Sequence, residues 1–102
     1  MKVAIQAGAG KDIQNCAKFW EKKCPGLGQE FIEFILFEVD KLERVAGIHP
    51  NSGRHYRMVV QGRFPYYSIF YRITGDTTEA IAIVDTRRDP EWIAAFLKRR
   101  LD

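Results

Sequence analysis

Basic and aromatic side chains alternate in the second half of the sequence, and together they can bind phosphate and stack on bases. From residue 44 to residue 75 there is no acidic residue and no lysine, but five arginines occur: Arg44, Arg54, Arg57, Arg63 and Arg72. Tyrosine and phenylalanine stand between them. The planar guanidinium of arginine suits phosphate and carboxylate groups and stacks on rings. This pattern is typical of a surface that binds RNA, single-stranded nucleic acid or an acidic protein. A twisted sheet with a solvated basic face and an aromatic core would give the same pattern.

The glycine-rich stretch AGAGKDI, residues 7 to 13, raises the question of a nucleotide site. A phosphate-binding loop requires a glycine five residues before the GK pair and a serine or threonine directly after it. Here Ile5 occupies that glycine position and Asp12 takes the place of the hydroxyl residue. Because a carboxylate there would repel a polyphosphate, we expect no nucleotide. We expect instead a strand that ends at Ala7, a turn at Gly8 to Gly10, and a helix capped by Asp12.

Length and composition fit one globular domain over residues 1–102, with 46% hydrophobic and 28% charged residues. Up to residue 43 there are six lysines and seven acidic residues, whereas from residue 44 onward there are ten lysines or arginines and six acidic residues. The second half is therefore the basic half. The most apolar stretch, FIEFILFEV, contains two glutamates, so we expect no membrane span. We expect a cytoplasmic protein, because the start lacks the apolar region of a secretory signal. Cys16 and Cys24 indicate neither a disulfide framework nor a zinc site.

The first half of the sequence predicts two helices. Apolar residues from Ile13 to Trp20 follow helical spacing, so a helix is predicted over residues 12–23 and ends at Cys24 and Pro25. A second helical pattern runs from Leu27 to Ala46, with Gly47 as the residue after its end. Because the connection between them is so short, the two helices must form an antiparallel hairpin.

Three predicted strands and a last helix follow: HYRMVVQ, PYYSIFYRIT and EAIAIVDT are separated by short links with glycine, which predicts an antiparallel meander. Asp89 and Pro90 predict the start of a helix that runs to about Arg100. The fold class is thus α+β: an N-terminal strand, a helical hairpin, a three-stranded meander completing a four-stranded sheet, and a C-terminal helix.

Alternation along the central strand predicts its two faces. Tyr67, Ile69, Tyr71 and Ile73 should pack on the helical hairpin, and Tyr66, Ser68, Phe70 and Arg72 should line the opposite face. We therefore expect arginines and tyrosines from residues 54 to 88 to gather on the side of the sheet that the hairpin leaves uncovered.

Three pieces of the sequence, in this order, resemble the RelE/ParE superfamily of bacterial toxins from toxin-antitoxin modules: FWEKKCPGLGQEFIEFI, RFPYYSIFYRI and IAIVDTRRDPEW. The resemblance covers roughly residues 3 to 93. It implies a compact type II toxin that an antitoxin wraps and neutralises. Some members cleave messenger RNA in the ribosome without a metal, whereas those of the ParE type, often called plasmid stabilisation proteins, block DNA gyrase.

The resemblance also implies candidate residues for a nuclease reaction, which requires a base, an acid and cations for the developing phosphorane charge. This sequence departs from the nuclease pattern in three places: Ser68 stands for a common arginine, Asp85 for a histidine and Trp92 for a tyrosine. Arg87 matches the family's arginine. If the chain is a nuclease, we expect the site to be built from the following residues: Arg57, Arg72, Arg87, Tyr66 and, as the base, His55. A lone histidine on a strand is more often a surface or packing residue.

The interpretation we prefer at this stage is a ParE-like inhibitor that acts by protein contact. Its expected partners are a cognate antitoxin and DNA gyrase, with the ribosome and its message as the alternative target, and a dimer or a heterotetramer with the antitoxin is compatible with this. A nonspecific RNA-binding module is a third alternative. We expect no cofactor and no metal. The candidate partner-binding residues are Arg63, Tyr67, Arg88, Trp92 and Phe96.

Overall fold

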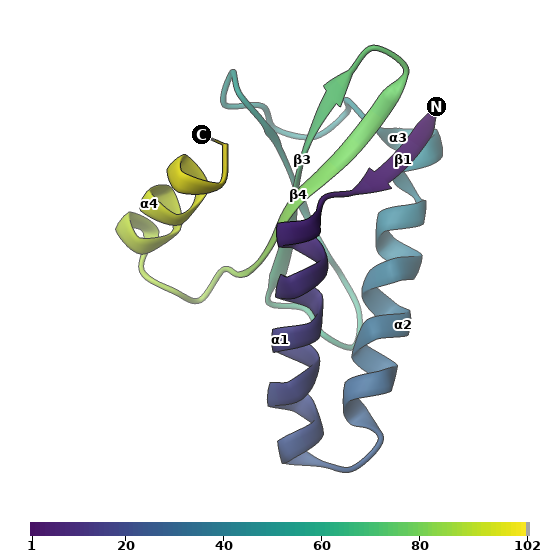
Figure 1. Ribbon diagram of the computed structural model, residues 1–102, viewed down its shortest axis with the longest axis vertical. Coiled ribbons are helices and arrows are strands. Elements are labelled where there is room, and N and C mark those ends of the chain that lie inside the picture. Colours follow the sequence, from purple (N-terminus) through teal and green to yellow (C-terminus); the bar gives the residue numbers. More distant parts are fainter. Residues whose placement is uncertain (102) are drawn as a thin grey trace.

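A computed structural model of the chain describes residues 1–101 and contains a four-stranded sheet with helices on both faces (Figure 1). Its elements are β1 (Lys2–Ile5), α1 (Ala7–Lys23), α2 (Leu27–Asp40), α3 (Leu42–Val45), β2 (Tyr56–Val59), β3 (Tyr67–Thr74), β4 (Thr77–Asp85) and α4 (Pro90–Leu101). The strand order is β1-β4-β3-β2; β1 runs parallel to β4, and the other pairs are antiparallel. The predicted α+β class, hairpin, meander and last helix are confirmed.

The first helix begins earlier than predicted. The glycine-rich stretch lies in the first turns of α1, where the amide of Gly10 donates to the carbonyl of Gln6. The predicted turn at Gly8 to Gly10 and the predicted cap at Asp12 are therefore wrong. Glycine lowers helix propensity, but the contacts of Gly8 and Asp12 with the last helix, described below, outweigh that local preference.

Glu21 and Gly28 allow the tight connection between α1 and α2. The carboxylate of Glu21 accepts hydrogen bonds from the amides of Gly26 and Gly28, each at 3.1 Å, and so satisfies free donors at the start of α2. A Cβ atom on Gly28 would lie only 2.7 Å from the carbonyl oxygen of Ala17. The absence of a side chain at Gly28 thus lets the two helices approach closely.

The second predicted helix is interrupted. It leaves regular helical structure after Asp40 and resumes as the short α3, whereas one continuous helix up to Ala46 was predicted. Gly47, with φ of 96°, takes the left-handed conformation expected after a helix end. The amide of Gly47 donates to the hydroxyl of Tyr71 at 2.9 Å, which ties this end to the sheet.

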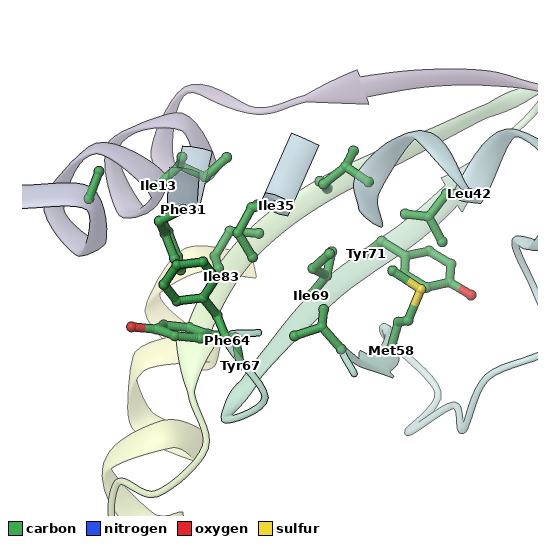
Figure 2. Close-up of a cluster of buried hydrophobic side chains, with 14 residues drawn as sticks. Ile13, Phe31, Ile35, Leu42, Met58, Phe64, Tyr67, Ile69, Tyr71 and Ile83 are labelled. Atoms are coloured by element: carbon green, nitrogen blue, oxygen red, sulfur yellow. The ribbon is translucent and has the colours of Figure 1, made fainter. Parts of the chain in front are cut away.

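The main core lies between the hairpin and the sheet (Figure 2). Tyr67, Ile69 and Tyr71 of β3 are almost completely buried on this face, as alternation predicts. The ring of Phe31 meets that of Tyr67 edge to face at 4.9 Å. Each such buried side chain contributes roughly 1.5–3 kcal/mol, so this core fixes the sheet on which the candidate residues stand.

The opposite face of the sheet is covered in part by α4, which packs Leu97 against Phe70 and Val84. The last helix lies on the other side of the sheet from the hairpin (Figure 1). A bulge lies here, because Phe70 pairs with Ala82 while Tyr71 pairs with Ala80. Ile81 is therefore an extra residue of β4. The basic face predicted as uncovered is thus partly covered.

The strands differ slightly from their predicted bounds. β2 is shorter than HYRMVVQ, β3 begins two residues after Pro65, and β4 begins at Thr77 instead of Glu79. Within residues 1–101, no helix is long and apolar enough to cross a membrane.

Candidate functional site

A groove of about 740 Å³ lies between α4, the loop before β2 and the middle of the sheet. Its apolar lining comes from the sheet residue Phe70 and from the side of α4 that carries Ile93, Ala94 and Leu97. The charged residues that line it are Arg54, Arg57 and Lys98. No acidic residue belongs to the lining within the described residues. The groove therefore combines an apolar floor with positively charged walls.

Arg57 is held in place by the sheet. It pairs with Phe70 across β2 and β3, and its guanidinium lies 5.9 Å from the centre of the Phe70 ring. Its Nε donates to Oγ of Ser68 at 3.1 Å. Ser68 is completely buried, so this bond satisfies an otherwise isolated hydroxyl. Ser68 stands where the nuclease pattern has an arginine, and here Arg57 of the neighbouring strand brings its guanidinium to the Ser68 hydroxyl.

His55 lies beside Arg57 in the same groove, with its ring 5.4 Å from that of Phe70. Burial, together with the nearby charge of Arg54, lowers the pKa of His55 below its usual value. The imidazole is therefore largely neutral at pH 7. The positive charge of the groove comes from its arginines and lysine.

Arg87 lies at the end of β4 and is engaged by Asp85. Its Nη2 lies 2.7 Å from Oδ2 of Asp85, its Nε donates to Oδ1 at 3.1 Å, and its guanidinium is stacked 4.3 Å from the ring centre of Tyr66. The Arg87 hydrogen bonds lower the pKa of Asp85. Asp85 therefore acts here as an anionic partner for arginine and not as a proton donor near pH 7.

Arg72 lies at the other end of β3, where its Nη2 is 3.3 Å from Oε2 of Glu79. It pairs with Glu79 across the strands, whereas Tyr67 pairs with Asp85. Five residues of strand separate these pairs, which corresponds to roughly 17 Å. Arg72 therefore cannot share a reaction site with Arg87 and Tyr66. The five predicted nuclease residues fall into three places: His55 with Arg57, Tyr66 with Arg87, and Arg72 alone.

Three of the predicted partner-binding residues form one surface stack. The guanidinium of Arg88 lies 4.1 Å from the ring centre of Trp92, and the rings of Trp92 and Phe96 are stacked at 5.1 Å. All three line a smaller cavity of about 350 Å³ between α1, the end of β4 and α4. Trp92 is 38% exposed and can contact a partner.

The other two predicted partner-binding residues, Tyr67 and Arg63, are not part of this stack. Tyr67 is 2% exposed and accepts a hydrogen bond from Nε1 of Trp20, so it belongs to the core, and its side chain also lines the smaller cavity. A direct contact between Tyr67 and a partner stays a prediction. Arg63 pairs with Glu30 of α2 at 2.9 Å, on the hairpin side of the molecule. The predicted gathering of arginines and tyrosines on one face is therefore only partly confirmed.

The sequence did not predict the contact between Asp12 and Arg100. Nη1 and Nη2 of Arg100 lie 2.9 and 3.1 Å from the two carboxylate oxygens of Asp12. Nη1 also donates to the carbonyl of Ile81, the extra residue of the bulge, at 2.7 Å. Local sequence signals predict a helix cap for Asp12 and a charge at a helix end for Arg100. Such signals cannot predict a contact between residues so far apart in the sequence.

Comparison with known proteins supports the architecture. No protein-family model matches the chain, and no curated protein matches it either. Among solved structures, it is similar to a chain of the "Chromosomal ParDE TA system from P. aeruginosa", with a TM-score of 0.74 and 16% sequence identity. The match covers 83% of this chain and 95% of the other. The resemblance noted in the sequence therefore holds at the level of the fold: the chain has a ParE-like α+β fold.

Proposed function

We propose that this chain is the toxin of a type II toxin-antitoxin pair, which inhibits growth by binding a protein target and is neutralised by a cognate antitoxin. The shared fold supports this role by analogy, because the similar chain comes from a ParDE toxin-antitoxin system. DNA gyrase is the target we propose to test first.

The observation that carries the choice of protein contact over RNA cleavage is that two of the three cation candidates are held in ion pairs. Arg72 is paired with Glu79, and Arg87 is paired with Asp85. Neither guanidinium can therefore stabilise the charge of a phosphorane without first breaking an ion pair. Arg88, Trp92 and Phe96 by contrast form a partly exposed aromatic and cationic stack, a composition enriched where proteins bind each other.

One observation favours a second candidate, a ribosome-dependent and metal-independent mRNA endonuclease. His55 and Arg57 line the same groove, so a general base and a cation do lie near each other. In that case Arg57 and His55 would carry the reaction, and Arg72 would not contribute.

Controlled expression tests the proposal. The chain is induced in bacterial cells with and without the protein encoded by the adjoining reading frame, and growth and plasmid topology are followed. We expect growth arrest with altered supercoiling, and relief of both by the second protein. Normal growth at high expression would reject the toxin role and favour a nonspecific RNA-binding module.

A further inference from the structure

We infer that the groove beneath α4 is the docking site for an acidic segment of a partner protein, one that carries aspartate or glutamate beside large apolar side chains. The inference rests on the proposed function only in taking this partner to be the neutralising antitoxin. It is distinct from the stack of Arg88 and Trp92, which lines the other side of α4.

The size and lining of the groove determine the kind of occupant. A volume of about 740 Å³ lies within the usual range of roughly 300–1,000 Å³ for binding pockets. Phe70, Ile93 and Leu97 offer an apolar floor to which leucine or phenylalanine side chains can bind. Apart from Phe70 this floor is aliphatic and offers no further ring on which a base could stack, which favours a peptide over a nucleic acid.

The charge of the groove selects an acidic peptide. Arg57 lies on one wall and Lys98, an exposed residue of α4, lies on the other. The interactions described for Arg57 are with the Ser68 hydroxyl and the Phe70 ring, neither of which neutralises its charge. A carboxylate placed between these walls would be attracted by both, and complementary charge of this kind gives specificity.

The wall opposite α4 is preformed. The loop before β2 folds back on its own strand, since the amide of Arg57 donates to the carbonyl of Pro50 at 3.0 Å and the amide of Ser52 donates to the carbonyl of His55 at 3.0 Å. The groove therefore does not have to be built when the partner binds, which lowers the entropic cost of binding.

A selection from a random 12-residue peptide library on the immobilised, full-length chain tests the inference. We expect the selected peptides to be rich in aspartate or glutamate together with leucine or phenylalanine, and their affinity to fall as salt is raised. Selected peptides without acidic residues would overturn the inference. So would displacement of the acidic peptides by a uridine 12-mer RNA, because the groove would then be a nucleic-acid site.

Paired variants of α4 locate the site. The double variant Ala94→Glu with Lys98→Glu adds negative charge to the groove, whereas Ala95→Glu with Arg99→Glu makes the same changes at neighbouring exposed residues that do not line it. We expect the first to weaken peptide binding about tenfold or more, and the second to change it less than about twofold. Equal effects would overturn the inference. If the first double variant fails to fold, Lys98→Glu is compared with Arg99→Glu by the same criterion.

Growth assays keep the two proposals separate. Peptide binding in the groove by a chain that does not arrest growth would reject the toxin role while supporting the docking site. A toxic chain with no groove-dependent peptide binding would overturn the docking site alone.

Discussion

Asp12 and Arg100, which lie 88 residues apart in the sequence, form a two-pronged ion pair that joins the first helix to the last. The side chains are 12% and 21% exposed, so water screens the pair only partly. Oδ2 of Asp12 also accepts from the amide of Ile83 at 3.0 Å, beyond the stretch of β4 that β1 pairs with. The pair thus satisfies backbone groups of β4 and fixes α4 against the sheet.

Loss of this ion pair should destabilise the chain. Arg100→Ala leaves the Asp12 carboxylate and the Ile81 carbonyl without their charged partner, and we expect a loss of about 2–4 kcal/mol in the free energy of unfolding. Arg99→Ala, the neighbouring exposed arginine, should change it by less than about 0.5 kcal/mol. Urea unfolding at pH 7 measures both. Equal, small losses would mean that the ion pair does not hold α4.

Gly8 should be required for stability, because the guanidinium of Arg100 lies against it and leaves no room for a side chain. A Cβ atom at Gly8 would lie 2.8 Å from Cζ of Arg100, whereas a Cβ atom at Gly10 would meet nothing within 4 Å. We expect Gly10→Ala to stabilise the chain by about 0.5–1 kcal/mol through helix propensity, and Gly8→Ala to destabilise it.

A double-mutant cycle checks the cause of the Gly8 effect. In the Arg100→Ala background the obstructing guanidinium is absent, so Gly8→Ala should become as favourable as Gly10→Ala. If Gly8→Ala remains destabilising there, the strain has another source.

The sequence was sufficient for elements whose signals are local. Asp89 and Pro90 start α4 as predicted, and the amide of Glu91 does donate to Oδ1 of Asp89. Alternation along β3 placed Ile69 and Tyr71 on the correct face because burial on one side of a sheet enforces a period of two.

The sequence was insufficient where distant residues decide. When only their neighbours are considered, Gly8 and Asp12 indicate a turn and a cap, whereas in the structure both lie in α1 against Arg100. In the candidate site, Ser68 predicted a missing arginine, yet Arg57 reaches its hydroxyl from the next strand. Residue type alone also could not predict that Arg72 and Arg87 lie far apart, since strand register determines the distance between them.

Cys16 should make the chain less stable at alkaline pH. Burial raises the pKa of its thiol from 9.0 to about 11. Between these values the unfolded chain has lost the proton that the folded chain keeps, so the free energy of unfolding should fall as the pH rises from about 9 to 11. Urea unfolding under reducing conditions should show this fall, and Cys16→Ala should reduce its slope. An unchanged slope in Cys16→Ala would assign the effect to Tyr67, whose pKa burial raises to about 12.

Arg87→Ala should raise the pKa of Asp85. The Arg87 hydrogen bonds are the main cause of the lowered value, and the charge of Arg88 contributes less. We therefore expect a larger upward shift in Arg87→Ala than in Arg88→Ala, measured by NMR titration of the Asp85 carboxyl carbon. Because a lowered folded-state pKa stabilises the chain above the unfolded value, the variant should also lose less stability as the pH falls through the acid range. A larger shift in Arg88→Ala would contradict the assigned ion pair.

The state of cellular messages when growth stops is the most direct test of inhibition by protein contact. RNA is sequenced from its 5′ ends at the onset of growth arrest after induction of the wild-type chain and of Arg57→Ala. The proposed function predicts no new cleavage sites in translated messages for either chain. New cuts that depend on the wild-type chain and disappear in Arg57→Ala would contradict it and identify the groove as a nuclease site.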